Sequence, residues 1–348
     1  MEQTYTFTIE SKKQNIDALS EEQQQEFKTH AQECQIIVLK GNSYSKQFFN
    51  QFSEYITTAK QLQKINGNDI FVGKGKDEIP QSLQILGNSL IGLNILSLDL
   101  SNNAVNPFGA EALKPFLKQA HQLQKLFLNN CGLGIRGVTQ ISEGLQEGEH
   151  NLQILAIARN RAECDGAIEI SKAFPTCKKL QELHIYQNGI KQKGMMELLS
   201  SLNKNCTELT TIDIRDNFVH EATTQVLSDL ITNSSHLTAI NISDCNIQGK
   251  QNKQILEALA KLVKIEKLGY NYAELNDVQG NELYEIIAKQ VENVTKLELK
   301  GNEFKKATKQ KFKELFATKE KVLGAFDSDD EDEEEADELQ KLFSQLVI

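Results

Sequence analysis

A nine-residue pattern recurs along this chain at a nearly constant interval. Positions 1, 4 and 6 hold aliphatic residues and position 9 holds Asn or Cys in most copies, as in the segment LQILAIARN at 152–160. The intervals between ninth positions are 28 or 29 residues, with one exception of 33. Chance does not preserve such a period over about 260 residues, so the pattern predicts a chain of stacked structural repeats. The ninth positions are residues 42, 70, 103, 131, 160, 188, 217, 245, 273 and 302.

Each repeat is predicted to contain a short strand followed by a helix. In GVTQISEGL, for example, Val138, Ile141 and Leu145 recur at helical spacing. The pattern therefore predicts an α/β leucine-rich-repeat solenoid of about 10 to 11 repeats, each of 28–29 residues. Because helices are wider than strands, a parallel inner sheet with outer helices should curve into a horseshoe or crescent. A glycine is expected just before several of the helices, at Gly109, Gly137, Gly166 and Gly194.

The ninth-position asparagine is expected to bond the backbone of the neighbouring turn, so that stacked copies form a ladder. The ends of such a stack need caps, which we assign to residues 1–30 and to the last helix at 305–316. The solenoid with its N-terminal cap is predicted at 1–320. An acidic, disordered tail with an apolar end is predicted at 321–348.

Charge and composition exclude several functions. The formal net charge is −10, and the ten carboxylates of residues 327–338 account for all of it. The rest of the chain has no net charge, which argues against nucleic-acid binding. The sequence contains no run of 18 apolar residues, so no membrane span is predicted. The six cysteines form no CxxC pair, and the chain has no common catalytic or phosphate-binding motif. We therefore expect a protein with reduced thiols, no metal, no cofactor and no active site of its own.

Arginine is placed unevenly, because only four of the 38 basic residues are Arg. Arg159, Arg161 and Arg215 lie in the loops where predicted strands leave the sheet, at or near template positions 7 and 8. Solvated loops would explain most polar residues there. Arginine, however, offers a planar fork of donors that lysine cannot replace. The placement therefore points to a protein partner along this edge. We expect Lys74, Lys76, Arg159 and Arg161 to form one positive stretch.

Several segments resemble the family of GTPase-activating proteins of the small GTPase Ran. The matching segments are NDIFVGKGKDEIPQSL, SLDLSNNAVNPFGAEAL, KLFLNNCGLGIRG, AIARNRAECDGA and HIYQNGI, followed by the acidic stretch. The resemblance implies activation of GTP hydrolysis without an arginine finger. Asn130 is the implied catalytic residue, which orients the glutamine of the GTPase that positions the attacking water. Lys74 replaces a family arginine. The predicted partner-binding residues are Lys74, Lys76, Asp77, Asn102, Asn129, Arg159, Arg161 and Asp216.

The implied molecule is a regulator that acts on the active site of its partner, a Ran-type GTPase in its GTP form. It would serve nucleocytoplasmic transport from the cytoplasm and the periphery of the nuclear envelope. The terminal LQKLFSQLVI has the spacing of a nuclear export signal, although a helix docked on the last repeat would show the same pattern. An export receptor and a Ran-binding protein are thus further expected partners. The alternative is a leucine-rich-repeat binding scaffold or inhibitor without GTPase activation, comparable to ribonuclease inhibitor.

Overall fold

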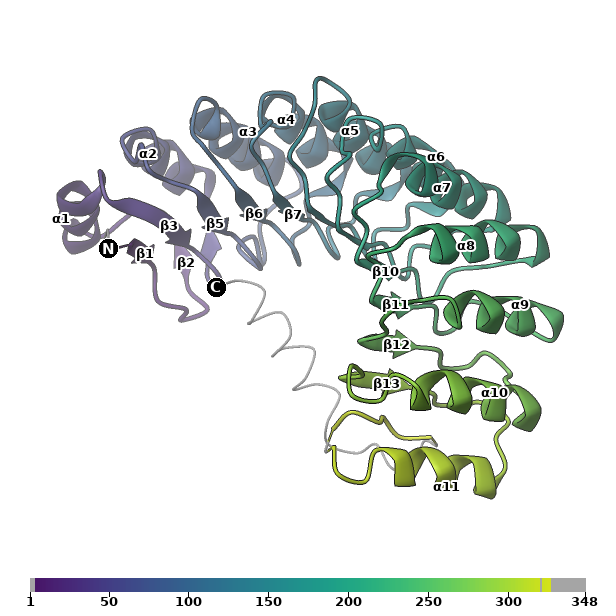
Figure 1. Cartoon of the computed structure of the whole chain (residues 1–348). Coiled ribbons are helices and arrows are strands. Elements are labelled where there is room, and N and C mark those ends of the chain that lie inside the picture. Colours follow the sequence, from purple (N-terminus) through teal and green to yellow (C-terminus); the bar gives the residue numbers. More distant parts are fainter. Residues whose placement is uncertain (1–3, 320, 327–348) are drawn as a thin grey trace. The chain divides into compact units, whose positions relative to one another are not determined.

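The computed structural model describes residues 4–319 and 321–326, in which short strands alternate with helices (Figure 1). The chain divides into two compact units, Met1–Glu208 and Leu209–Ile348. Within each unit, the strands form a parallel sheet, and the helices lie along one side of that sheet (Figure 1). Among the described residues, no helix has the length and apolar character of a membrane span. The acidic run 327–338 and LQKLFSQLVI lie outside the described residues.

The first unit contains seven parallel strands in the order β1-β3-β5-β6-β7-β8-β9 and a small two-stranded sheet of β2 and β4. Its strands are β1 Tyr5–Thr8, β2 Asn15–Ile16, β3 Cys34–Val38, β4 Ser43–Tyr44, β5 Lys64–Asn66, β6 Ser97–Asp99, β7 Lys125–Phe127, β8 Ile154–Ala156 and β9 Glu182–His184. Its helices are α1 Glu21–His30, α2 Lys46–Ile56, α3 Glu78–Leu90, α4 Asn106–Leu117, α5 Gly134–Leu145, α6 Glu163–Ser171 and α7 Gln192–Asn205.

The second unit continues the same alternation with four parallel strands in chain order. Its elements are β10 Thr211–Asp213, α8 Glu221–Asn233, β11 Ala239–Asn241, α9 Lys250–Leu259, β12 Lys267–Gly269, α10 Asp277–Ala288, β13 Lys296–Glu298 and α11 Lys306–Leu315. Neighbouring strands pair at equivalent template positions, as Ile240 does with Leu268. The register of the sheet therefore follows the sequence repeat, which confirms the predicted α/β solenoid.

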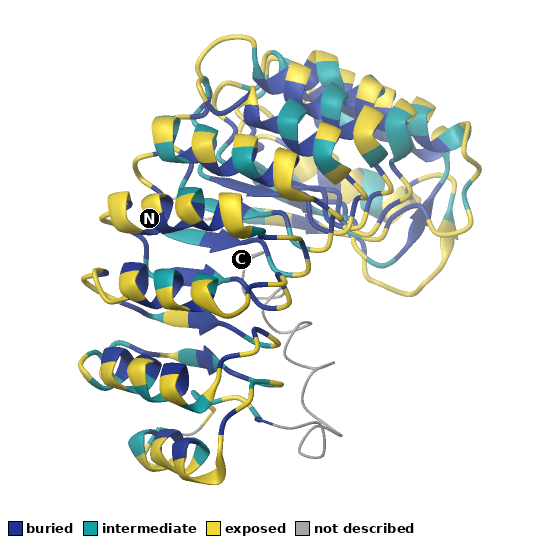
Figure 2. Ribbon diagram, turned by 90° about the vertical axis from the view of Figure 1, so that its right-hand side faces the viewer, coloured by how far each residue is buried: buried dark blue, intermediate teal, exposed yellow. Residues whose placement is uncertain are grey.

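The core lies between the sheet and the helices. Aliphatic residues at positions 4 and 6 are buried in successive repeats, as Leu126 and Leu128 are beside Leu98 and Leu100. The helices contribute the opposite wall and expose their outer faces (Figure 2). In α5, Val138 is among the buried residues, as the helical spacing predicted. Burial of this apolar surface is the main force that holds each repeat to its neighbours.

The four glycines expected before the helices lie inside them, in the first turn or just after it. At Gly109 in α4, an added Cβ would come within 2.8 Å of Leu83 in α3. At Gly194 in α7, it would come within 2.7 Å of the Cα of Cys164 in α6. The expectation was wrong in position, because these glycines serve close packing between helices rather than a turn before them.

The described residues of both segments assigned as caps pack on the repeat beside them. In the N-terminal cap, β1 pairs with β3, and Phe7 packs against Phe27 and Phe52. At the other end, the ring of Phe326 lies 6.2 Å from those of Phe304 and Phe312. Residues 321–326 therefore pack on the last repeat. The tail predicted from 321 onward remains a prediction for residues 327–348.

Candidate functional site

The turn after most strands is held by the side chain of the ninth-position residue, where that residue is Asn or Cys. The Nδ2 of buried Asn160 donates to the carbonyl of Leu128 at 2.7 Å and to that of Ile157 at 2.9 Å. Its Oδ1 accepts from the backbone N–H groups of Cys131, at 2.9 Å, and Leu133, at 3.3 Å. One amide thus satisfies backbone groups in its own repeat and in the preceding one. This arrangement confirms the predicted ladder.

Cys131 takes the asparagine place with fewer bonds. Its Sγ donates to the carbonyl of Leu100 at 3.1 Å, and burial raises the pKa of the thiol to about 12. A thiol with this pKa stays protonated at neutral pH and acts here as a hydrogen-bond donor, not as a nucleophile. Within the described residues, no group of three or more His, Cys, Asp or Glu side chains is arranged to hold a metal ion.

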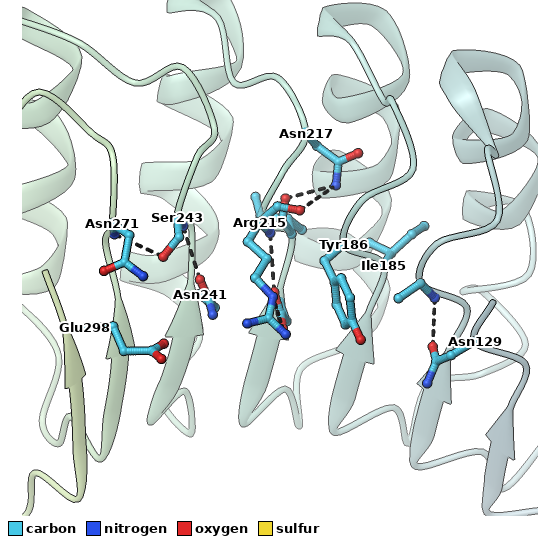
Figure 3. A network of polar contacts seen from close by, with 12 residues as sticks. Asn129, Ile185, Tyr186, Arg215, Asn217, Asn241, Ser243, Asn271 and Glu298 are labelled. Carbon is cyan, nitrogen blue, oxygen red and sulfur yellow. Dashed lines mark hydrogen bonds and ion pairs between the residues drawn. The ribbon is translucent and has the colours of Figure 1, made fainter. Parts of the chain in front are cut away.

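Position 7 is also part of the ladder. The Oγ of buried Ser101 accepts from the backbone N–H of Asn129 at 3.2 Å. Asn129 in turn accepts from the N–H of Ala158 at 2.8 Å, as Figure 3 shows, and is only 5% exposed. Ser243 and Asn271 repeat the contact in the second unit (Figure 3). The burial of Asn129 does not support its predicted role as a partner contact, because its side chain is bonded to the next repeat.

Position 8 differs from position 7 in structure, although both positions are mostly polar in sequence. The residue at position 8 of every repeat has a left-handed backbone, with φ between +50° and +83°. Those with side chains are exposed. We call these residues the eighth-position row of their unit. The first-unit row is Gly41, Asp69, Asn102, Asn130, Arg159 and Gln187, and the second-unit row is Asp216, Asp244, Tyr272 and Gly301.

Composition could have revealed this left-handed turn. Seven of the ten eighth positions are Gly, Asn or Asp, the residues that tolerate positive φ best. Arg159, Gln187 and Tyr272 are the exceptions, and each adopts a conformation that costs energy for a side chain of its type. Each repeat whose eighth residue is not glycine therefore presents one outward side chain from the same backbone turn.

Asn102 and Asn130, two of the predicted site residues, are brought together by this row. The Nδ2 of Asn130 donates to the Oδ1 of Asn102 at 3.1 Å. Both side chains are exposed, and their backbones have φ of +52° at Asn130 and +59° at Asn102. The candidate catalytic amide therefore stands at the surface with a defined neighbour in the preceding repeat.

Lys74, Lys76 and Asp77 lie in a loop that other repeats lack. Helix α3 begins eight residues after the ninth position at residue 70, whereas α4 and α5 begin three residues after theirs. The five additional residues account for the single 33-residue interval. The loop is anchored at its start, where the Oγ of Ser43 donates to the carbonyl of Val72 at 2.6 Å. Lys76 and Asp77 are exposed and Lys74 is half-buried.

Arg159 and Arg161 differ from the other two arginines. Both are exposed and both have left-handed backbones, with φ of +58° and +55°. Within the described residues, neither forms an ion pair. By contrast, Arg136 pairs with Glu111 at 3.3 Å and Arg215 pairs with Asp213 at 3.4 Å. The unpaired guanidinium groups keep their donors for an external acceptor.

The expected single positive stretch is interrupted. Strand order places the repeats of β6 and β7, which carry Asn102 and Asn130, between the lysine loop after β5 and the arginines after β8. Three strand steps correspond to roughly 14 Å at the sheet. The cations therefore flank the amide pair instead of forming one continuous patch.

Asp216 belongs to the second unit, whereas the other predicted site residues belong to the first. It is exposed and lines a shallow hollow of about 230 Å³ that also includes Asp244, Glu274 and Tyr272. This edge is acidic, whereas the first-unit row carries three amides, one carboxylate and one guanidinium. His184, on β9, contacts Glu182 at 3.2 Å.

Comparison with known proteins supports the repeat and points to one group of relatives. A family model described as a leucine-rich repeat matches residues 93–114 and 233–250. Ran GTPase-activating protein 1 of Xenopus laevis is 36% identical over 45% of this chain and 29% of its own length. The Ran GTPase-activating protein of Drosophila melanogaster is 33% identical over 48% of this chain and 30% of its own length. Ran GTPase-activating protein 1 of Saccharomyces cerevisiae is 23% identical over 77% of this chain and 71% of its own length.

The fold and the family match define a leucine-rich-repeat protein. The matched region spans less than a third of the length of the frog and fly relatives. Over roughly half of its length, the chain is similar to Ran GTPase-activating proteins of frog, fly and worm.

Proposed function

We propose that this chain stimulates GTP hydrolysis by a Ran-type small GTPase in its GTP-bound form. The proposal is based mainly on the position of Asn130, whose exposed amide lies on a left-handed turn and is hydrogen-bonded to Asn102. The names of the relatives supply the partner class. Asp77, which is exposed in the first unit, would add an acidic contact to the partner.

The chemistry follows from what an amide can do. GTP hydrolysis needs a water molecule held in line with the γ-phosphorus. An amide has one donor end and one acceptor end, so Asn130 can hold the glutamine amide of a GTPase in a single orientation. Catalysis would then come from positioning in trans. No arginine finger is invoked, and Arg159, Arg161, Lys74 and Lys76 serve as contacts to the partner surface.

Single-turnover phosphate release tests the proposal. A Ran-type GTPase loaded with GTP is mixed with increasing amounts of the chain, and the rate of phosphate release is followed. The proposal expects a rate that rises with the chain and saturates. The alternative, a binding scaffold or inhibitor, expects binding of the loaded GTPase with no increase in phosphate release. That second outcome would reject activation.

We propose in addition that the chain acts in the cytoplasm, and at the periphery of the nuclear envelope, in nucleocytoplasmic transport. A gradient of GTP-bound Ran requires activation to be kept away from chromatin, and LQKLFSQLVI would serve an export receptor. A Ran-binding protein would act on the same complex. Changing Leu342 and Leu346 to Ala should raise the nuclear signal of a fluorescent fusion without altering activation in solution. Unchanged cytoplasmic signal would favour a docking helix instead.

A further inference from the structure

The hydrogen bond between Asn102 and Asn130 defines which end of the Asn130 amide is already used. Nδ2 of Asn130 donates to Oδ1 of Asn102 at 3.1 Å. Within the described residues, Oδ1 of Asn130 takes part in no hydrogen bond. Because one of the two N–H groups on Nδ2 is used in this bond, the amide is held in one orientation and its oxygen, an acceptor, is left for a partner.

We propose that Asn102 is a positioning residue that fixes the orientation of the Asn130 amide. Asn130 would then present Oδ1 and accept a hydrogen bond from an N–H group of the GTPase, such as the NH₂ of its glutamine side chain. This inference rests on the proposed function and assigns a role to Asn102 different from a direct partner contact. Without Asn102, the Asn130 amide could rotate and present either end.

The backbone beneath the pair is held on both sides. The N–H of Asn102 donates to the carbonyl of Asn129, and the N–H of Asn130 donates to that of Ala158, both at 2.8 Å. Just before Asn102, the buried carboxylate of Asp99 accepts from the N–H of Ser101 at 2.8 Å. Because both turns are fixed to their neighbours, the distance between the two side chains is set by the sheet and not by loop motion.

The neighbouring eighth positions could not replace Asn102 in this role. Arg159 is the eighth-position residue that follows Asn130, and its guanidinium has no acceptor. Asp69 is the eighth-position residue that precedes Asn102, so it lies two repeats away from Asn130. Asn102 and Asn130 are the neighbouring eighth-position side chains that share a hydrogen bond within the described residues. The contact is therefore a property of this pair and not a general feature of the repeat.

The chain itself indicates the best variants. Gly41 and Gly301 occupy the eighth position with φ of +83° and +68°, so Asn102→Gly removes the side chain without straining the turn. Asn102→Asp keeps an acceptor for Nδ2 of Asn130 and removes the donor end. Asp244→Gly, at the same turn in the second unit, is a matched control for deletion of an eighth-position side chain.

Single-turnover phosphate release should separate positioning from contact. Asn102→Gly is expected to lower the maximal rate at saturating activator about 3- to 10-fold, the usual worth of one hydrogen bond. The half-saturating concentration should change little. Asp244→Gly should stay within about 2-fold of wild type, and Asn102→Asp should keep more of the maximal rate than Asn102→Gly. The proposal is overturned if Asn102→Gly raises only the half-saturating concentration, or if Asn102→Asp loses as much maximal rate as Asn102→Gly.

A second measurement does not depend on the GTPase. The side-chain NH₂ signals of Asn130, assigned by their loss in Asn130→Gly, are recorded in the free chain labelled with ¹⁵N-asparagine. They should shift in Asn102→Gly and shift differently in Asn102→Asp, where the acceptor is charged. Signals that are unchanged in both variants would overturn the orienting bond. If the wild-type chain does not accelerate hydrolysis, the proposed function fails while these signals still decide whether the bond exists.

Discussion

The first-unit and second-unit rows share one backbone and carry different chemistry. Asn102 and Asn130 in the first unit and Asp216 and Asp244 in the second all have φ between +52° and +59°. In the first-unit row, two bonded amides lie between Asp69 and Arg159, and in the second-unit row Asp216 and Asp244 line a shallow hollow. In both units, the hydrogen-bond ladder formed by positions 7 and 9 holds the turn and so fixes the direction of each eighth-position side chain. The identity of that side chain is then free to serve a partner.

The ladder is the shared part of the comparison, and breaking it should have the largest effect. Asn160→Ala is expected to lower the free energy of unfolding by about 3–5 kcal/mol, because it leaves buried backbone groups without partners. Asn302 makes the equivalent bonds in the second unit, to Ala273 and Tyr270, but is only half-buried. Asn302→Ala should therefore cost less. Denaturant unfolding measures both, and equal losses would contradict the role given to burial.

The two units differ in their eighth-position side chains, and removal of the candidate catalytic amide of Asn130 tests the importance of this difference. Asn130→Gly suits the turn better than Asn130→Ala, because φ at this residue is +52°. We expect single-turnover activation to fall by about 30- to 1000-fold, corresponding to about 2–4 kcal/mol of transition-state stabilisation. Asp244→Gly, the same change in the second-unit row, should retain activation. An Asn130→Gly variant with near-normal rates would remove Asn130 from the mechanism.

Charge reversal at the lysine loop should have a moderate and salt-dependent effect. Lys76 is exposed, and Lys76→Glu is expected to slow association with the GTP-loaded partner about 3- to 10-fold at low salt. The effect should shrink as salt screens the charge. Lys267→Glu, an exposed lysine on β12 of the second unit, is the control. Stopped-flow association measures both. Equal rates for wild type and Lys76→Glu at low salt would show that Lys76 is only solvated.

The smallest effect concerns the strained arginine. Arg159 has φ of +58°, and asparagine adopts this conformation at lower cost. Arg159→Asn should therefore raise the free energy of unfolding by about 0.5–1 kcal/mol while slowing association. Arg136→Asn should instead lower stability, because Arg136 is helical, pairs with Glu111 and lies 5.3 Å over the ring of Phe108. Thermal unfolding in parallel checks both signs. A loss of stability in Arg159→Asn would argue against strain at this turn.

The repeat period was enough to predict the fold, because each copy buries the same positions against its neighbours. The buried Leu126 and the ladder bonds of Asn160 follow directly from the template. The difference between positions 7 and 8 did not follow, since both are polar in sequence. Their roles depend on the backbone turn, which buries Asn129 and exposes Asn130. The glycines were misplaced for a similar reason, because close helix packing and a turn both favour glycine.

The lysine loop shows where a repeat can grow. Although β5 and β6 are separated by the 33-residue interval, Ile65 still pairs with Leu98 as shorter repeats pair. The additional residues lie between the turn after β5 and the start of α3. They therefore do not change the register of the sheet. Insertions at this point add new surface beside Asn102 at no cost in strand alignment. Lineages that carry this fold could thus lengthen, shorten or recharge the loop to retune partner choice, while the amide pair stays where the sheet holds it.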